Sequence, residues 1–362
     1  VHYVTIEDGI SGVGASKLLT KKQAQREGRS ETDGDNGGSN ATADGTAGGE
    51  KITIMNTDGV GGGGSHIAII PPELSSFADL IDPLTATDVP FFWHIPRSGG
   101  STFKDIAAFC LMLVQASHFG GTLDEYEDAD ELMVIEDIDR GAKFVNVDTT
   151  TSEGLQRAIE MGIGSFEGLD LIFSPLVFEV TAAFSNERRG RMFAMFRHPV
   201  DRAVSMYYYL YNDPKLKEML NGASLEEYAR VGPVENNWMV RFLSNAPDGE
   251  LTADHEAIAK EVLRRKCLIG ILGRKAESLR RFEQFFGWKI TGEKMEACHE
   301  RLLIWDWANK NKHPLIKEGT TVWKLLENYN LFDIRLYYYA EELFIEQAGL
   351  FTERSEGQYY QI

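Results

Sequence analysis

The sequence is poor in cysteine and has no cysteine pair at metal-binding spacing. Its 362 residues include three cysteines, Cys110, Cys267 and Cys298, and no CxxC pair. Zinc sites use closely spaced cysteines, and small secreted proteins use many of them for a disulfide framework, so neither is indicated. Three cysteines leave room for one disulfide, and they do not determine the compartment.

Long apolar runs are also missing. No stretch approaches the roughly 20 apolar residues that a membrane-spanning helix needs. Val1 to Leu19 lacks the basic start and the apolar middle of a signal peptide. Because residue 1 is valine and not methionine, a trimmed N-terminal anchor stays open as the one expected link to a membrane.

Positive charge is scarce, with 37 Lys and Arg against 55 Asp and Glu, a net charge of −18. Such a surface does not suit nucleic acid, so no nucleic-acid partner is expected, and any anionic ligand has to be bound by a local group of cations. Much of the acid lies in residues 124–139, which we interpret as a solvated helix face or loop; a metal site there is the less favoured interpretation.

The first 66 residues are predicted to be a flexible, low-complexity arm. Glu27 to Ser65 consists mainly of Gly, Ser, Thr, Asn and Asp, a composition that buries too little apolar area to offset the entropy of ordering. The arm contains one glycosylation acceptor pattern at Asn40, which matters only in the secretory pathway. Residues 67–362 are predicted to form a single domain.

Within that domain, short apolar strands alternate with longer helical patterns, which is typical of an α/β fold with a parallel sheet flanked by helices. The predicted strands are 91–95, 143–147, 169–173, 192–196 and 267–272. The predicted helices are 103–116, 199–211, 224–229, 238–243, 255–265, 276–286 and 334–348, so the C-terminal half is rich in helix.

One strand runs directly into a glycine turn and a helix, in FFWHIPRSGGSTFKDI, residues 91–106. Such a P-loop-like turn points backbone N–H groups and the positive end of a helix dipole at one spot, which makes it an anion site. Gly99 and Gly100 are expected to let the backbone approach a ligand. The other predicted ligands are Arg97, Ser98, Ser101 and Thr102.

The turn lacks the lysine and the spacing of the nucleotide-phosphatase motif GxxxxGK[ST]. A magnesium-dependent kinase or NTPase is therefore disfavoured. An ordinary strand-to-helix turn without a ligand is the structural alternative for this segment taken alone.

A second stretch, RMFAMFRHPVDRAVSMYYYLY, has the same architecture. An apolar strand ends at Arg197, a helix begins at Pro199, and Ser205 lies eight residues after Arg197. The forked donors of Arg197 and the hydroxyl of Ser205 can converge on one phosphate. Since ligands of open parallel sheets bind outside the carboxyl ends of the strands, the two stretches together predict a nucleotide with phosphates at both ends.

These two stretches resemble the motifs of sulfotransferases that use PAPS, 3′-phosphoadenosine 5′-phosphosulfate. HIPRSGGST resembles the family's 5′-phosphosulfate loop, and FRHPVDRAVSMYYY its 3′-phosphate motif, with Arg197 and Ser205 in the matching positions. Motifs related to heparan and uronyl 2-O-sulfotransferases extend the resemblance over residues 91–347. They are ENNWM with RFL at 235–243, FFGW at 285–288 and DI with LY at 333–337.

The resemblance implies a sulfotransferase with PAPS as co-substrate, no metal, and a carbohydrate hydroxyl as acceptor. Such glycan enzymes are commonly held in the Golgi lumen by an N-terminal anchor and a stem; a cytoplasmic location is the alternative. A lipid, a sterol or a small metabolite are alternative acceptors, since an acidic chain is unlike enzymes that act on polyanions.

The chain departs from the family at two points. Arg97 stands where the family has lysine, which keeps the charge but cannot donate a proton near neutral pH. The histidine base of the uronyl-type enzymes is replaced by Ser174 and Pro175 in LIFSPLVFEV. The acceptor-activating base is therefore open among Glu179, Asp148 and His94, and a nucleotide-binding protein without turnover is the alternative function.

Overall fold

The computed structural model describes residues 69–118, 126, 129–137, 141–304 and 313–352. The described residues all belong to one compact unit. The predicted arm over residues 1–66, with Asn40, lies outside them.

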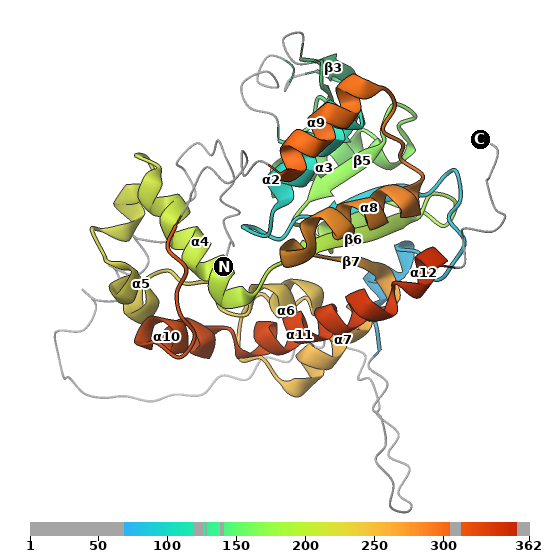
Figure 1. The fold of residues 1–362 in the computed structure, drawn as a ribbon. Helices are drawn as coiled ribbons and strands as arrows, with labels where there is room; N and C mark the ends of the chain where they lie inside the picture. The colour runs from blue at the N-terminus through green and yellow to red at the C-terminus, as the bar shows by residue number, and fades with distance from the viewer. Residues whose placement is uncertain (1–68, 119–125, 127–128, 138–140, 305–312, 353–362) are drawn as a thin grey trace, which may run out of the picture. The chain divides into compact units, whose positions relative to one another are not determined.

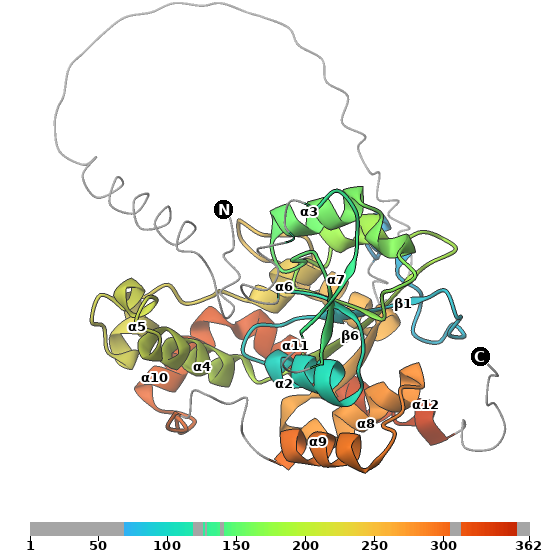
Figure 2. The same ribbon diagram turned by 90° about the horizontal axis from the view of Figure 1, so that it is seen from above.

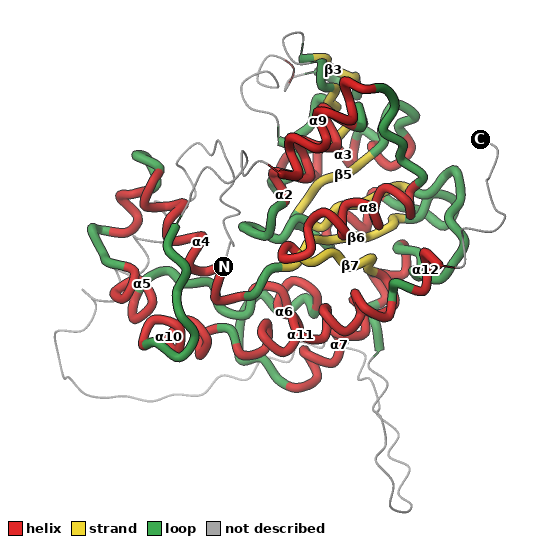
Figure 3. Tube along the Cα trace, in the orientation of Figure 1, coloured by secondary structure: helices red, strands yellow, loops and turns green. Residues whose placement is uncertain are grey.

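A seven-stranded sheet forms the centre of this unit (Figures 1 and 3). Its order is β3-β4-β2-β5-β1-β6-β7, and β3 pairs antiparallel with β4 while the other pairings are parallel. The strands are β1 (Val89–Trp93), β2 (Gln115–Ala116), β3 (Val134–Glu136), β4 (Lys143–Val145), β5 (Leu171–Ser174), β6 (Gly190–Phe196) and β7 (Cys267–Ile271). The predicted α/β fold with a parallel sheet is confirmed.

Helices cover both faces of the sheet (Figure 2). Alternating residues of β1 show why: Phe91 and Trp93 pack into one apolar cluster with α3, α6, α7 and α11, whereas Phe92 packs into the other with α2, η2, α8 and α9. Successive side chains of a strand point to opposite faces, so a continuous apolar strand needs a helical layer on each side.

The helices confirm the prediction of a helix-rich C-terminal half. They are α2 (Gly100–Asp105), the π-helix η2 (Ile106–Cys110), α3 (Ser152–Glu160), α4 (Pro199–Asn212), α5 (Leu225–Val231), α6 (Trp238–Leu243), α7 (Ala253–Lys266), α8 (Lys275–Phe286), α9 (Glu293–Ile304), α10 (Thr321–Tyr329), α11 (Leu331–Glu346) and α12 (Gly349–Thr352). The helices α3, α9, α10 and α12 were not predicted.

The predicted helix over residues 103–116 is wrong in its second half. The chain leaves the helix after Cys110, turns at Met112 with φ of 56°, and enters β2 at Gln115. The carboxylate of Asp170 accepts a hydrogen bond from Val114 N at 2.8 Å and holds the start of β2. The acidic stretch 124–139 is likewise corrected where it is described, since Val134–Glu136 forms an edge strand.

Beside the carboxyl edge of the sheet, α4, α5 and α10 pack on one another through a separate apolar cluster that includes Val204, Ala229 and Leu326. Pro199 begins α4 directly after β6, with its fixed φ suited to the first helical turn. These helices therefore place the side chains of α4 next to the ends of β1 and β6.

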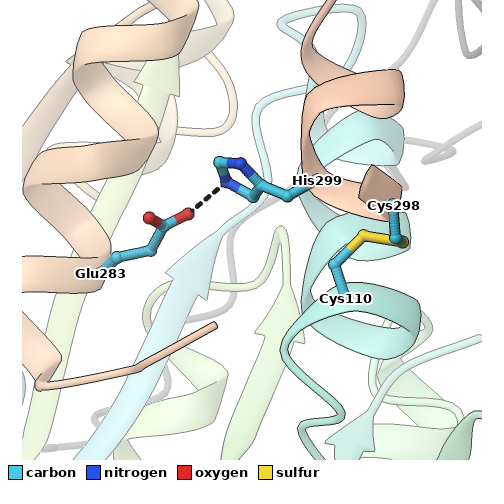
Figure 4. Close-up of a disulfide and its surroundings, with 4 residues drawn as sticks. All are labelled: Cys110, Glu283, Cys298 and His299. Atoms are coloured by element: carbon cyan, nitrogen blue, oxygen red, sulfur yellow. Dashed lines mark hydrogen bonds and ion pairs between the residues drawn. A yellow bond between two sulfur atoms is a disulfide. The ribbon is translucent and has the colours of Figure 1, made fainter. Parts of the chain in front are cut away.

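Two side-chain links join the helices that cover one face of the sheet (Figure 4). A disulfide connects Cys110 at the end of η2 to Cys298 in α9. The next residue, His299, places Nε2 2.6 Å from the carboxylate oxygen Oε1 of Glu283 in α8. Cys267 is a buried free thiol in β7.

The motif residues Asn237 and Asp333 cap each other's helices. Asp333 is fully buried and accepts hydrogen bonds from the backbone N–H groups of Met239 and Val240 at 2.9 and 2.8 Å, in the first turn of α6. Asn237 Oδ1 accepts from Phe332 N and Asp333 N at the start of α11. This pair of caps gives the ENNW and DI motifs a structural role.

Candidate functional site

The two predicted anion-binding stretches meet at the carboxyl ends of neighbouring strands, β1 and β6. Arg197 follows β6 directly, and its Nη1 donates a hydrogen bond to the backbone carbonyl of Arg97 at 3.1 Å. Arg97 in turn donates from Nε to Ser205 Oγ at 3.3 Å. The structure thus brings Arg97, Arg197 and Ser205 together, as the spacing of the motifs predicted; we call these three residues the arginine cluster.

Arg97 has an unusual backbone conformation. Its φ of 62° lies in the left-handed region, which costs a residue with a Cβ on the order of 1 kcal/mol. The turn directs its side chain toward α4, where the guanidinium carbon lies 4.6 Å from the ring centroid of Tyr209. Contacts with Tyr209 and Ser205 therefore hold a strained residue in one orientation.

The two glycines of the turn are required by packing within the protein. Gly99 has φ of 91°, and a Cβ there would lie 2.7 Å from Leu272 Cδ1. A Cβ on Gly100 would lie 2.1 Å from Cδ2 of His94, whose ring closes beneath the turn. The sequence analysis assigned these glycines to ligand approach; the structure adds this second reason for them.

The hydroxyl groups of the turn differ in exposure. Ser98 is 1% exposed, and within the described residues its Oγ has no hydrogen-bond partner. Ser101 is exposed and Thr102 is half-buried, both in the first turn of α2. A buried hydroxyl without a protein partner is costly, and a ligand oxygen at the turn would satisfy it.

Burial and nearby cations shape the electrostatics of the arginine cluster. Burial lowers the pKa of Arg197, and the positive charges of Arg97 and Arg202 lower it further, whereas Asp201 opposes them. Like charges held this close repel each other, and an anion between them relieves the repulsion. The cluster therefore favours an anionic ligand in a protein whose total charge is negative.

His313 contacts the cluster from the segment before α10. Its Nε2 lies 3.4 Å from Nη2 of Arg197, and its ring stacks on Tyr208 of α4 with 5.3 Å between centroids. From the sequence, the polar segment with Lys312, His313 and Lys317 was interpreted as a loop that closes over the nucleotide, although His313 was not among the predicted ligands.

A histidine that the sequence analysis missed pairs with one of the base candidates. His118 Nδ1 lies 3.0 Å from the carboxylate oxygen Oδ2 of Asp148, and Thr150 donates to Oδ1 of the same carboxylate from its backbone N–H at 2.8 Å. Burial raises the pKa of Asp148, but hydrogen bonds from His118 and Thr150 outweigh burial, so the pKa lies below its usual value. His118 was missed because residues 103–116 were predicted to be one helix. That prediction placed no strand before His118, so the residue was not expected at the edge of the sheet.

The His118–Asp148 pair is tied through α2 to the turn that follows β1, residues 94–99, which we call the phosphate turn after its predicted ligand. Lys104 Nζ donates to the backbone carbonyl of His118, and the backbone carbonyl of Lys104 accepts from Gln115 Nε2 at 3.0 Å. Since α2 begins at Gly100, these bonds fix the end of β2 against the helix that follows the turn. The pair and the arginine cluster thus lie at the same edge of the sheet.

The other base candidates have different surroundings. His94 is 2% exposed and stacks on Phe173, and burial, followed by the charges of Lys104 and Arg97, lowers its pKa to about 3. Glu179 is exposed at the start of η6 (Glu179–Ala183), which contacts α3. Among the described residues no hydrogen bond or ion pair joins Glu179 to the arginine cluster. The lowered pKa makes His94 a weak base near neutral pH, and Glu179 stays a prediction.

Metal-binding clusters and membrane-spanning helices are both absent from the part of the chain that the structure describes. No group of three or more His, Cys, Asp or Glu side chains there is placed to hold a metal ion. No helix there combines the length and the apolar character that crossing a membrane needs.

Comparisons with known proteins give distant likenesses to solved structures. No family model matches the chain, and no curated protein matches it. Among solved structures, the crystal structure of the mouse sulfotransferase SULT7A1 complexed with PAP is 16% identical, with a TM-score of 0.32, over 79% of this chain and 89% of that one. So low a score carries no argument about the function of this protein.

Proposed function

We propose that the protein is a sulfotransferase that moves the sulfuryl group of PAPS to a hydroxyl acceptor. The convergence of Arg97, Arg197 and Ser205 at the ends of two adjacent parallel strands carries this proposal. The turn after β1 binds the 5′-phosphosulfate, and Arg197 with Ser205 binds the 3′-phosphate. Both assignments follow the motif resemblance, and the buried hydroxyl of Ser98 supports an oxygen ligand at the turn.

His118 is the proposed general base, with Asp148 as its positioning residue. Asp148 accepts a hydrogen bond from Nδ1 of His118, so Nε2 is the basic nitrogen of the ring, and we propose that it takes the proton of the acceptor hydroxyl. β2 lies two strands from β1, roughly 10 Å away at the usual strand spacing. His118 follows β2 and Arg97 follows β1, so both residues lie at the carboxyl edge of the sheet.

The proposed transfer forms one bond to sulfur, breaks another and moves one proton. The acceptor oxygen forms a bond to sulfur, the bond between sulfur and the bridging oxygen of the 5′-phosphate breaks, and the hydroxyl proton moves to His118 Nε2. Arg97 stabilises the negative charge that develops on the departing 5′-phosphate of PAP, the desulfated nucleotide. Catalysis of such a loose, in-line transfer depends mainly on positioning and charge stabilisation.

We propose a carbohydrate hydroxyl as the acceptor and the Golgi lumen as the location. The motif resemblance supports the acceptor class, and the Cys110–Cys298 disulfide supports an oxidising compartment. Lipid, sterol and small-metabolite acceptors, and a cytoplasmic location, are the alternatives.

Incubation with sulfur-labelled PAPS and a panel of glycans, sterols and small alcohols tests the activity. Transfer by the protein, and its loss in Arg197→Ala but not in the surface variant Arg264→Ala, is the expected result. Arg264 pairs with Glu261 on α7, away from the strand ends, so the variant controls for the loss of one arginine. Calorimetric binding of PAP without transfer to any acceptor would instead favour a nucleotide-binding protein, and absence of PAP binding would refute the nucleotide site.

A further inference from the structure

The ring of His313 is held in one orientation by two partners of opposite kinds. On one side, Nδ1 lies 3.2 Å from the backbone carbonyl of Pro314. On the other, Nε2 lies 3.4 Å from Nη2 of Arg197. Its face stacks on Tyr208, with 5° between the two ring planes.

These partners determine which ring nitrogen carries the proton. A carbonyl can only accept, so Nδ1 carries the hydrogen and donates it to Pro314. A guanidinium can only donate, so Nε2 presents its lone pair to Arg197. The imidazole is therefore neutral and accepts from Arg197 when no nucleotide is bound.

A phosphate on Arg197 reverses the demand on His313. Phosphate oxygens only accept hydrogen bonds, and the unprotonated Nε2 has no hydrogen to donate to them. Arg197 Nη2 then donates to the phosphate instead of to the imidazole. A proton on Nε2 makes the ring a donor at both nitrogens and adds a positive charge next to the dianion. The proton comes from solvent, and no other bond forms or breaks.

We propose that His313 is a ligand of the phosphate bound by Arg197 and that it takes up a proton when the phosphate binds. This inference rests on the proposed PAPS site and goes beyond it, because it makes nucleotide affinity depend on pH through one residue. The contribution of His313 to binding then grows as the pH falls through the range in which histidine titrates.

The described groups next to His313 are a cation and a neutral phenol. From the end of β6 it faces Arg197, which is itself in contact with Arg97, and from α4 it faces the phenol of Tyr208. A phosphate bound by these arginines adds negative charge beside the ring, which favours a protonated imidazole. Binding and proton uptake are therefore coupled.

Calorimetry of PAP binding in buffers that differ in ionisation enthalpy counts the protons exchanged. The phosphate monoester, with a second pKa of about 6, itself releases protons when arginines bind it. The informative quantity is therefore the difference between the protein and His313→Gln. His255→Gln, a histidine on α7 that glutamine can replace as a helix-capping residue, is the matched control.

We expect the protein to take up a fraction of a proton, up to one, more than His313→Gln does, for PAP but not for adenosine 5′-monophosphate, which lacks the 3′-phosphate. His313→Gln should also bind PAP about tenfold more weakly near neutral pH and more weakly still under mildly acidic conditions. His255→Gln should behave like the unmodified protein.

Equal proton exchange by the protein and His313→Gln would overturn the proposal, and so would a loss of affinity that is the same at every pH, because mere packing would produce it. In both cases PAP binding that depends on Arg197 leaves the nucleotide site itself in place. Failure of PAP to bind at all would overturn this inference and the nucleotide site together.

Discussion

At the residue scale, the phosphate turn depends on small side chains. His94 lies directly beneath Gly100, so the turn and the last part of β1 are packed as one unit. The sequence predicted the turn and its arginine because glycine, proline and serine stand next to one another. It could not predict that the ring of His94 is what excludes a Cβ at Gly100, since that contact depends on how the helix folds back.

Gly100→Ala is expected to destabilise the protein by about 1–3 kcal/mol, because the new Cβ would lie 2.1 Å from the His94 ring. Urea unfolding measures the loss. Gly273→Ala, at a glycine with nothing within 4 Å of the added Cβ, should change stability by far less. Adding His94→Ala should reduce the cost of the alanine at 100; a cost that stays the same would show that His94 is not its cause.

His118→Gln is expected to lower kcat by about 100-fold to 10,000-fold, because it removes the proposed general base. PAP affinity should hardly change, since the arginine cluster is intact. Asp148→Asn should lower kcat less and shift the pH–rate profile, because Asp148 acts only by orienting His118. Steady-state kinetics over a pH range with PAPS and an identified acceptor gives both values. Unchanged kcat in His118→Gln would assign the proton to another group.

At the scale of secondary-structure elements, prediction succeeded where the sequence pattern is local. β1, β6 and β7 are continuous apolar runs, and α4 begins at a proline, so both kinds of element were visible. β2 has two residues and β3 lies in an acidic stretch, so neither carries a strand pattern. The end of η2 depends on Met112 in a left-handed conformation and on Asp170, which is 56 residues away from its partner Val114.

The same reasoning applies to the site. Arg97, Arg197 and Ser205 could be predicted because each follows a recognisable strand within a short motif. His118 meets Asp148 only when β2 and the segment after β4 are in place, and His313 meets Arg197 only when the segment before α10 is in place. No local pattern links them.

The mutual caps of α6 and α11 predict a pH-dependent stability. Burial raises the pKa of Asp333 to about 6, although Arg202 and the N–H groups of Met239 and Val240 oppose the rise. A folded-state pKa above the unfolded value means that the folded state favours the protonated acid. The stabilisation, on the order of 3 kcal/mol, is thus full below about pH 4 and is lost as the pH rises through about 6.

Asp333→Asn tests this dependence, because asparagine cannot titrate. The difference in unfolding free energy between the protein and the variant should change between about pH 4 and pH 7. As the pH rises, the unmodified protein should lose stability relative to Asp333→Asn. Taking the difference removes the opposite contributions of Asp79, Asp148 and Glu256, whose lowered pKa values favour folding at higher pH. A difference that is constant over this range would contradict the raised pKa of Asp333.

At the scale of the whole molecule, a net charge of −18 surrounds a small group of cations. A polyanionic nucleotide is repelled by the protein as a whole and attracted only near the strand ends. The arginine cluster, with His313 beside it, therefore has to supply the affinity at close range. This arrangement also favours a neutral acceptor over a polyanionic chain, because such a chain would extend beyond the cations.

The disulfide acts at the same scale, because it joins residues 188 positions apart in the sequence. It connects η2, which continues the helix after the phosphate turn, to α9 on the same face of the sheet (Figure 4). Replacing Cys110 and Cys298 together by alanine is expected to destabilise the protein by about 2–5 kcal/mol, mainly because the unfolded chain gains freedom.

Urea unfolding with and without a reductant separates this effect from the packing change of the substitution. Reductant should destabilise the unmodified protein and leave the double variant unchanged, since Cys267 has no partner to lose. If reductant leaves the stability of the unmodified protein unchanged, the disulfide does not stabilise the protein. The disulfide then no longer supports a lumenal location. A large loss would instead tie the folded state, and the helix that carries the phosphate turn, to an oxidising compartment.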